Sequence, residues 1–350
     1  MWITRAQSVS DRAQWRDAAA APSELPDAFT FAEARALGVT RRRLDSEDLS
    51  RPFRGGRVMI TSGDADQTEP DIWDRMRREH VGRMRAYAPL LPPDGYFCGP
   101  SAAIAWRIPM PPWVWQKDAL HVGVHRPRRA PRRPGIIGHQ HTRGFVKVGE
   151  TDGLPVTDAA STWATLGGIL GLDALVAAAD HVLRVPRHPG GFAPVTETAL
   201  ATREELEILT RRRGRPGAPR LRQALELART GAASAPETQI RLIIRGAGMP
   251  EPMLDYDVYD DHGRFLGCSE LAYPELKLAI EYESDGHLTR KQLQRDIDKY
   301  QSYTEAGWYP VRLTSEHVYR HPSETVRRVR RARAMASRHG FRPDFPSIWH

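Results

Sequence analysis

The alternation of apolar and polar positions is most regular in the last third of the chain. In residues 277–283, Leu278, Ile280 and Tyr282 alternate with polar or small residues, and a period of two is typical of a half-buried strand. Neighbouring runs predict three further strands, at 253–259, 264–272 and 308–314. Ser234 is the expected cap of a helix whose first turn holds Pro236 and Glu237, and helical spacing predicts two further helices over 288–306 and 323–337.

These elements follow one another as helix, three-stranded meander, helix, strand and helix. That order predicts an α/β domain over residues 234–340, with a right-handed parallel crossover between its last two strands. On the 288–306 helix, the apolar spacing predicts that one side faces the sheet. The residues expected on that inner side are Leu293, Ile297, Tyr300 and Thr304.

A different pattern, in residues 25–65, predicts a small helical unit. Thr30 and Glu33 have the spacing of a capping box, and Gly38 is a typical helix end. Thr40 then opens a second short helix. This spacing is typical of a helix-turn-helix whose second helix enters the major groove. Residues 53–60 are expected to follow it as a hairpin-like wing. The alternative is a helical hairpin with a solvated basic face. The candidate nucleic-acid contacts are Thr40, Arg41, Arg42, Arg43, Arg54 and Arg57.

Between these parts the pattern is mixed, and we divide the chain accordingly. We expect an N-terminal arm (1–24), a winged helix-turn-helix (25–65), an α+β middle domain (66–200), a basic linker with helices (201–233) and the C-terminal domain (234–340).

The middle domain contains a proline-stiffened loop at 126–134 with five arginines. We interpret it as a solvated loop, with phosphate contact as the alternative. His139 and His141 are interpreted as a surface pair.

Composition narrows the function classes. The chain has 350 residues, with 51 Lys and Arg against 43 Asp and Glu, a net charge of +8. This balance favours nucleic acid as a partner, although a compositional bias towards Arg would give the same numbers. Two cysteines, Cys98 and Cys268, define neither a disulfide framework nor a zinc site. The sequence has no long apolar stretch, so we expect a cytoplasmic protein with no membrane partner.

Three carboxylates near one edge of the predicted sheet are the candidate chemistry. Glu281 and Glu283 point to the same face of their strand, about 6.5–7 Å apart, and Glu270 ends the preceding strand. Like charges this close are tolerated where a cation lies between them. We therefore expect Mg²⁺, with Mn²⁺ as the alternative, at a site that acts on phosphodiesters. The alternative is a solvated sheet face.

The C-terminal domain resembles the PD-(D/E)XK nuclease superfamily and, more narrowly, the very-short-patch-repair (Vsr-like) endonucleases. The resemblance is carried by Pro236–Arg241, Glu270–Tyr282, Arg295-Asp296 and Ala306-Gly307-Trp308. It implies a restriction-endonuclease-like fold, a mixed sheet flanked by helices, with metal ligands at Glu270, Glu281 and Glu283. The catalytic residues it implies are Glu237, Glu270, Glu281, Glu283, His287, Asp296 and Lys299.

This chain departs from the family pattern at two points. Glu270 stands where relatives mostly have Asp, and Glu283-Ser284 stands where they have Asp-Gly. His287 falls at the position of the family's histidine, as general base or proton donor. Lys299 replaces the lysine that the wider superfamily often keeps beside its second acid.

The N-terminal two-thirds is similar to AbiEi-type antitoxin proteins, through the winged helix and Gly153–Thr157. Two functions follow as expectations. The first is a Mg-dependent DNA endonuclease, a hydrolase, with an N-terminal DNA-binding module; a mismatch-type nickase is a lesser variant. The second is a non-catalytic DNA-binding regulator or antitoxin-like protein that retains a nuclease fold. A toxin or a methyltransferase would be the corresponding protein partner.

Overall fold

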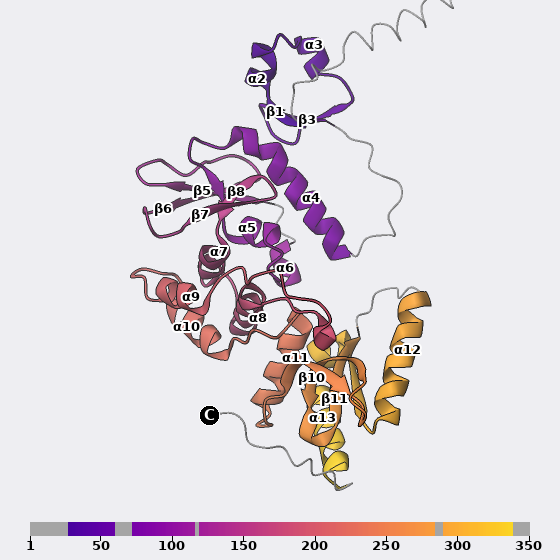
Figure 1. Ribbon diagram of the computed structural model, residues 1–350. Helices are drawn as coiled ribbons and strands as arrows, with labels where there is room; N and C mark the ends of the chain where they lie inside the picture. The colour runs from indigo at the N-terminus through magenta and orange to yellow at the C-terminus, as the bar shows by residue number, and fades with distance from the viewer. Residues whose placement is uncertain (1–26, 60–71, 116–118, 284–289, 339–350) are drawn as a thin grey trace, which may run out of the picture. The chain divides into compact units, whose positions relative to one another are not determined.

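The computed structural model describes residues 27–59, 72–115, 119–283 and 290–338. These residues form an α/β protein whose mixed sheets are flanked by helices (Figure 1). The chain divides into two compact units. The first contains the described residues up to Ala105 together with Trp115–Asp158, and the second contains Trp106–Val114 and the described residues from Ala159 onward. The division at Asp158 falls inside the region 66–200 that was expected as one domain.

Residues 27–59 of the first unit form a small sheet with two short helices. The sheet has the strand order β1-β3-β2, with β1 at Ala28–Thr30, β2 at Leu49–Ser50 and β3 at Gly56–Met59. Along the chain, the helices α2 (Phe31–Ala36) and α3 (Arg41–Leu44) lie between β1 and β2. The predicted capping box is confirmed: Glu33 N donates to Thr30 Oγ1 (3.0 Å) and Thr30 N donates to Glu33 Oε2 (2.7 Å). Thr40 caps α3, as predicted.

The rest of the first unit is a five-stranded mixed sheet in the order β6-β5-β4-β8-β7. On β5, Leu120, Val122 and Val124 are fully buried, and this strand contacts α5. The pairs β5–β6 and β4–β8 are parallel, and the others are antiparallel. The bounds are α4 (Ile72–Tyr87), η1 (Ala88–Leu90), β4 (Tyr96–Phe97), α5 (Gly99–Ala105), β5 (Leu120–His125), β6 (Ile136–His141), β7 (Val148–Thr151) and β8 (Leu154–Thr157). The short helix α6 (Pro112–Trp115) lies at the end of the stretch Trp106–Val114, which belongs to the second unit.

The second unit begins with a helical layer. Its elements are α7 (Ala159–Leu166), α8 (Leu172–Leu183), η2 (Pro189–Gly191), α9 (Arg203–Thr210) and α10 (Ala218–Leu227). Trp163 is fully buried and donates its indole N–H to Leu175 O (3.0 Å), which joins α7 to α8. Because α8 carries apolar residues around most of its circumference, it is covered by helices on several sides, including α10 and α11.

The remaining elements of the second unit follow the predicted order. They are α11 (Ala235–Gly246), β9 (Met253–Tyr259), β10 (Phe265–Tyr273), η3 (Pro274–Leu276), β11 (Leu278–Glu283), α12 (Arg290–Glu305), β12 (Tyr309–Thr314), η4 (Glu316–Arg320) and α13 (Pro322–Arg338). The sheet order is β12-β11-β10-β9; β9, β10 and β11 are antiparallel, and β11 and β12 are parallel.

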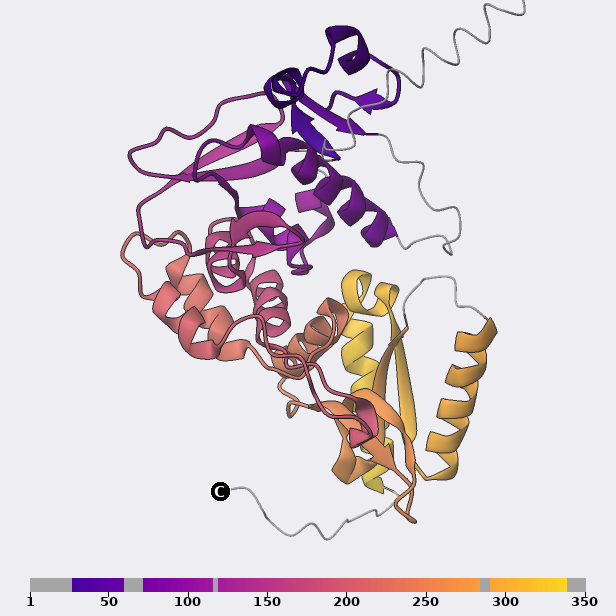
Figure 2. The same cartoon turned by 45° about the horizontal axis from the view of Figure 1, so that its top comes forward.

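Helices cover both faces of this sheet. Ile240 and Ile244 of α11 and Val329 of α13 share one core with Leu278 and Ile280 of β11. On the opposite face, Tyr303 of α12 packs with Ala279 and Trp308. In Figure 2, α12 (light orange) and α13 (yellow) accordingly lie on opposite sides of the strands. The alternation in β11 thus sends Leu278, Ile280 and Tyr282 to the α11–α13 core, as predicted.

Two arginines, Arg241 and Arg187, form ion pairs between the helical layer and this sheet domain; the first is buried and the second half-buried. Arg241 of α11 is fully buried and donates to Asp180 Oδ2 of α8 (2.8 Å) and to Glu251 Oε1 (2.9 Å). Arg187 donates to Asp255 Oδ2 (2.7 Å) and Asp257 Oδ2 (2.8 Å) of β9. None of the helices in the described ranges combines the length and apolar content needed to cross a bilayer.

Candidate functional site

Glu270 and Glu281 come together where β10 and β11 separate. The antiparallel pairing ends at Leu271 opposite Ile280. One residue beyond, the Glu270 carboxylate accepts a hydrogen bond from Tyr282 N (Oε2, 2.7 Å). The side chain of Glu270 therefore binds the backbone of the neighbouring strand, which places its carboxylate beside Glu281.

Glu281 is the central residue of the site. It is only 3% exposed, and its Oε2 accepts a hydrogen bond from Lys299 Nζ of α12 (3.0 Å). Its other oxygen, Oε1, is buried and has no hydrogen-bond partner among the described residues. The nearby Ser269 hydroxyl donates to Leu271 O (2.9 Å), and it also lies close enough to Glu281 to lower the pKa of that carboxyl. An unsatisfied carboxylate oxygen in such surroundings is costly, so this atom is positioned to meet a ligand.

A second buried polar atom lies in the same neighbourhood. Tyr303 is fully buried, and its hydroxyl also has no hydrogen-bond partner in the part of the chain that the structure describes. The Lys299 ammonium lies 5.4 Å from the centre of its ring. Burial raises the pKa of Tyr303, and the charge of Glu281 raises it further. This hydroxyl therefore remains protonated and can act as a hydrogen-bond donor in the site.

The carboxylates of the site disfavour one another's charge. The pKa of Glu270 is raised to about 8, mainly by burial and then by the negative charges of Glu237 and Glu281; the Tyr282 N–H and Lys299 act in the opposite direction. Burial also raises the pKa of Glu281, against the attraction of Lys299. A cation bound between these groups would favour their ionised forms.

Glu237 contributes from the first turn of α11. It is 4% exposed, and its carboxylate accepts from Ala233 N (2.8 Å) and from the Ser234 hydroxyl (2.8 Å), the N-cap of the helix. Burial raises its pKa. Glu237 therefore closes the helix end while adding negative charge beside Glu270. It thus lies next to the candidate site, but its hydrogen bonds serve the start of α11.

Glu283 does not join the other two predicted metal ligands. Its Oε1 accepts from Arg312 Nε (2.7 Å) and from the Tyr300 hydroxyl (2.7 Å). Burial would raise its pKa, but these hydrogen bonds outweigh that effect and the net shift is downward. Within the described ranges, no group of three or more His, Cys, Asp or Glu is arranged to hold a metal ion. The ligand set expected from the sequence is thus reduced to Glu270 and Glu281.

The remaining predicted catalytic residues divide in two. His287 lies outside the described residues, as does Ser284, where the chain departs from the family pattern. Asp296 acts on Arg312, whose pKa is raised mainly by the hydrogen bond to Glu283 and further by the charge of Asp296. Lys299 is the one that the structure brings to the carboxylates.

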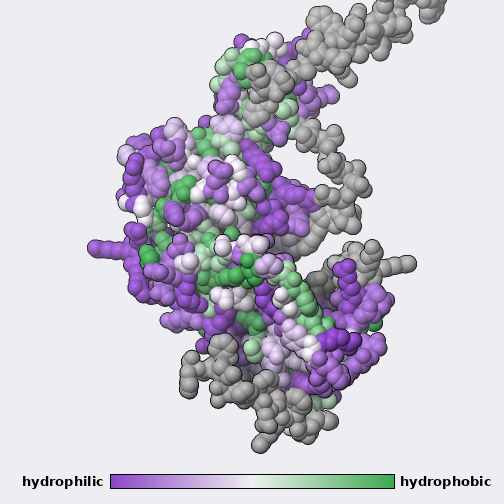
Figure 3. Space-filling view, in the orientation of Figure 1, coloured by the Kyte–Doolittle hydropathy of each residue, from purple (hydrophilic) through white to green (hydrophobic). Residues whose placement is uncertain are grey.

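The expected inner side of α12 is wrong for three of its four residues: Leu293, Ile297 and Thr304 are exposed, whereas the Tyr300 hydroxyl does reach Glu283 on β11. Leu293 and Ile297 are about half exposed, at 48% and 50%, whereas Lys299 and Tyr303, one turn apart, face the sheet. Helix α12 is accordingly hydrophilic in the space-filling view (Figure 3). The apolar spacing failed here because the helix covers a polar site. The four-residue spacing of Lys299 and Tyr303 is the sequence signal that could have placed Tyr303, which was not among the expected inner residues, on the inner face of α12. The β11–β12 register, which pairs Glu281 with Arg312, is known from the structure alone.

Among the predicted nucleic-acid contacts, two arginines have internal roles. Arg43 makes a two-pronged pair with Asp48 (2.9 and 2.7 Å). Arg57 is 8% exposed and donates to Leu44 O (2.7 Å) and Gly56 O (2.9 Å). Thr40 is exposed but serves as the cap of α3. The candidates that remain exposed at the surface are Arg41, Arg42 and Arg54.

The predicted surface histidines take part in hydrogen bonds within the first unit. Nε2 of His139 lies 2.9 Å from Nδ1 of His121, and Nδ1 of His141 lies 2.8 Å from the Tyr96 hydroxyl. Burial lowers the pKa of His139. These pairs give both rings fixed partners, so neither is available as a simple exposed ligand.

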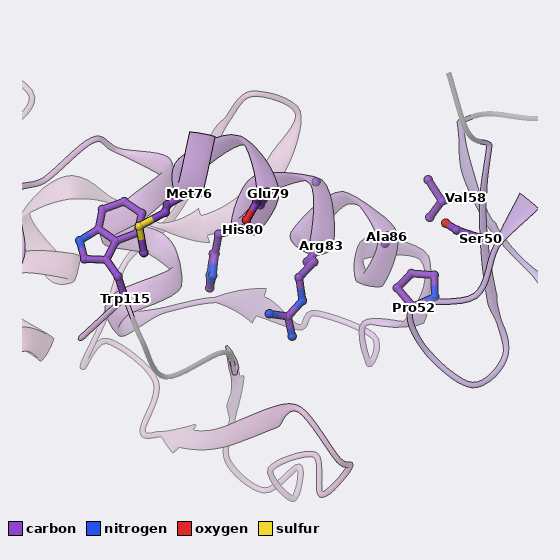
Figure 4. A pocket seen from close by; sticks show the side chains of 10 residues that line it. Ser50, Pro52, Val58, Met76, Glu79, His80, Arg83, Ala86 and Trp115 are labelled. Carbon is purple, nitrogen blue, oxygen red and sulfur yellow. The ribbon is translucent and has the colours of Figure 1, made fainter. Parts of the chain in front are cut away.

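A pocket of about 580 Å³ in the first unit has no counterpart among the sequence predictions. It lies along α4, with Met76, Glu79, His80 and Arg83 on one side and Pro52 on another (Figure 4). His80 shares a hydrogen bond with the Ser101 hydroxyl (3.0 Å), and burial lowers its pKa to about 4. The imidazole is therefore neutral near pH 7. The lining combines one neutral histidine with a carboxylate, a guanidinium, a hydroxyl and apolar surface.

Comparison with known proteins gives no function. No family model and no solved structure matches the chain. Two proteins of Mycobacterium tuberculosis, the uncharacterized proteins MT2308 and Rv2248, are each 31% identical to it over 151 residues, 43% of this chain. The chain spans about half the length of these curated relatives (55%). A functional assignment must therefore start from the site.

Proposed function

We propose that this chain is a Mg²⁺-dependent DNA endonuclease that hydrolyses phosphodiester bonds, with a winged helix-turn-helix in residues 27–59 as its DNA-binding module. The observation that carries the proposal is the buried Glu281, whose Oε1 has no partner in the described chain. It lies beside Glu270, whose raised pKa of about 8 reflects burial and neighbouring negative charge. Excess buried negative charge with an open acceptor atom is the environment that a divalent cation would stabilise.

The residues present fit a magnesium ion. Glu270 and Glu281 would hold it, and Mg²⁺ typically needs one or two carboxylates while it keeps several waters. Mn²⁺, which accepts the same oxygen ligands, is the alternative. When bound, the ion would lower the pKa of a coordinated water and polarise a phosphate oxygen.

The protein's own side chains would supply orientation and charge. Lys299 holds Glu281 Oε2 and places an ammonium at the site, where it would stabilise negative charge that develops on the phosphate. The Tyr303 hydroxyl, kept protonated by burial, would donate a hydrogen bond to a water or phosphate oxygen. Arg312, 54% exposed and stacked on Tyr300, stands beside Glu283 at the rim of the site.

The order of the elements supports a restriction-endonuclease-like assignment for residues 234–338. The antiparallel β9–β11 meander, the α12 crossover and the parallel β12 follow the arrangement that the resemblance implies. The predicted acids Glu270 and Glu281 lie on its central strands, and Lys299 lies on the crossover helix.

A DNA-binding regulator or antitoxin-like protein is the second candidate. The observation that favours it is the pairing of Glu283 with Arg312, which removes one of the three expected metal ligands. In this case the nuclease-like fold would serve binding alone, with a toxin as a protein partner. Glu270 opposes this reading, because its carboxylate accepts from the Tyr282 backbone instead of pairing with an arginine.

Plasmid cleavage tests the proposed function. The purified chain should nick or cut supercoiled DNA with Mg²⁺ or Mn²⁺ and not with a chelator. Glu281→Gln, which preserves shape, should reduce the rate roughly 100-fold or more, in the range seen when a charge-stabilising group is lost. Glu275→Gln, at an exposed position of η3, is the matched control. Cleavage that survives Glu281→Gln would overturn the assignment, and DNA binding without cleavage under every metal condition would favour the regulator.

Metal binding can be measured separately from activity. Mg²⁺ should raise the melting temperature of the wild-type chain, because a ligand that binds only the folded state stabilises it. The increase should be lost in Glu281→Gln and retained in Glu275→Gln. Equal stabilisation of all three proteins would place the ion elsewhere.

A further inference from the structure

The loop between β5 and β6 concentrates uncompensated positive charge. Residues 126–134 hold five arginines and no acidic residue, and all five arginines are exposed. Within the described part of the chain, none of their side chains forms an ion pair or a hydrogen bond. The five residues are Arg126, Arg128, Arg129, Arg132 and Arg133.

This situation differs from that of other arginines in the same unit. Arg43 is paired with Asp48, and Arg77 with Asp152. In these two cases a carboxylate neutralises the guanidinium group, whereas the loop 126–134 contains no acidic residue. Five neighbouring guanidinium groups without one repel each other, a cost that an anionic partner would offset.

The backbone of the loop is held in place by hydrogen bonds. Arg126 N donates to His141 O (2.9 Å), Arg128 N donates to His125 O (3.0 Å), and the Gln140 side chain donates to Arg128 O (2.7 Å). Ile136 N donates to Arg133 O (3.0 Å) at the other end. These contacts, together with three prolines, fix the loop along the edge strand β6. A surface ordered in advance loses less conformational entropy when it binds.

The middle of the loop also packs closely on this strand. A Cβ atom added at Gly138 would lie 2.2 Å from the carbonyl oxygen of Pro131. Glycine is therefore required at this point of β6 for the loop to approach the strand. Residues 126–134 therefore form a solvated loop, as the sequence predicted, whose backbone is held against the edge strand of the sheet.

The loop 126–134 ends close to Phe53, the first residue of the proposed wing of the DNA-binding module. A Cβ added at Gly135, just after the loop, would lie 3.9 Å from Phe53 Cε1. Phe53 packs edge-on against Tyr87 of α4 (5.0 Å between ring centres), and the pKa of Tyr87 responds to the charge of Arg133. Phe53 directly precedes the exposed Arg54. The basic loop and the proposed wing thus share one neighbourhood within the first unit.

We infer that the loop 126–134 is a second DNA-contact surface, which binds the phosphate backbone of a duplex next to the proposed wing. The inference rests on the proposed DNA binding and assigns it an additional surface. Guanidinium groups match phosphate oxygens in a two-pronged geometry. The loop has no aromatic residue that could stack on an unpaired base, so its contact is to the backbone, independent of sequence.

Salt-dependent binding of the full chain to a short duplex of arbitrary sequence tests this surface. The measurement is fluorescence polarisation in chelator, so that cleavage does not interfere. The triple variant Arg128→Gln, Arg129→Gln and Arg132→Gln removes three charges. Each lost phosphate contact lowers the slope of log K against log salt by about 0.9. We therefore expect the slope to fall by about 2 to 3 and the affinity near physiological salt to fall by roughly 10- to 100-fold.

The matched control removes three exposed arginines from the second unit, in the triple variant Arg211→Gln, Arg212→Gln and Arg213→Gln. Its slope should remain close to that of the wild type. An unchanged slope in the loop variant, an equal loss in the control, or tighter binding of a single-stranded oligonucleotide than of the duplex would each overturn the inference.

Failure of this inference is distinguishable from failure of the proposed nuclease. Glu281→Gln should slow cleavage roughly 100-fold or more while it leaves the salt slope intact. The loop variant should lower the slope while its metal-dependent stabilisation remains. Thermal unfolding of both triple variants checks that they fold, which substitutions at exposed positions should permit.

Discussion

Glu270 is a buried carboxyl whose pKa, at about 8, lies well above the ordinary value because of burial and the charges of Glu237 and Glu281. Between its unfolded and folded pKa values, the folded state binds more protons than the unfolded state. Stability is therefore highest below the unfolded pKa and falls as pH rises towards the folded value. Ionised carboxylates without a cation thus destabilise the site in which they lie.

We expect the free energy of unfolding to decrease between about pH 5 and pH 8 in the absence of divalent ions, by a few kcal/mol at most. Glu270→Gln should reduce this decrease, because the amide cannot ionise but can still accept from Tyr282 N. Urea denaturation in the presence of a chelator, at several pH values, measures the free energy of unfolding of both proteins. Identical pH profiles for the wild type and the variant would contradict the surroundings described for Glu270.

Arg241 shows how a single buried residue can hold two layers together. It is fully buried between Asp180 and Glu251. Arg241→Ala should lower the free energy of unfolding by about 3–5 kcal/mol, because Asp180 would be left as a buried charge without its main partner. Arg245→Ala is the control: this arginine also pairs with Glu251 but is 48% exposed, and its loss should cost less than about 1 kcal/mol. Similar losses in both variants, measured by urea denaturation, would contradict this account.

At the scale of the element, α12 is oriented by the site it covers. Its polar residues Lys299 and Tyr303 face β11, and its apolar Leu293 and Ile297 are half exposed. An amphipathic helix normally turns its apolar stripe inward. Here the buried carboxylate of Glu281 attracts the ammonium, and the Tyr303 ring fills the space beside Ala279 and Trp308.

Stability measurements can test this orientation. Leu293→Gln and Ile297→Gln should each change the free energy of unfolding by no more than about 0.5 kcal/mol, as at other surface positions. Tyr303→Ala should cost about 3–5 kcal/mol, because it leaves a cavity in the core beneath α12. A large loss at Ile297 together with a small one at Tyr303 would indicate the helix orientation that the apolar spacing first suggested.

At the scale of the whole chain, the two units carry different candidate functions. The first unit holds the proposed DNA-binding module and the basic loop 126–134, and the second holds the Glu270–Glu281 site. The basic charge of the sequence, a net +8, is thus concentrated in part at a structured surface of the first unit. We therefore expect the proposed DNA binding and the proposed cleavage to respond to different substitutions, which the two sets of variants test.

Local signals in the sequence were enough for much of the fold. The capping box of Thr30 and Glu33, the Ser234 cap of α11 and the alternation of β11 depend on neighbours within a few residues, and all are present in the structure. The order of elements from α11 to α13 follows from the same short-range periodicities. Such features are readable because helix and strand periods are set by backbone geometry.

Side-chain partners depended on residues far apart in the sequence. Glu283 meets Arg312 across 29 positions, and Glu281 meets Lys299 across 18. Arg57 is held by backbone oxygens, including Leu44 O, that periodicity cannot indicate. A charged residue looks the same in the sequence whether it is solvated, paired or facing a ligand. Only the packing of β10, β11 and α12 separates the open oxygen of Glu281 from the neutralised carboxylate of Glu283, because the free energy of a charge depends on what surrounds it in space.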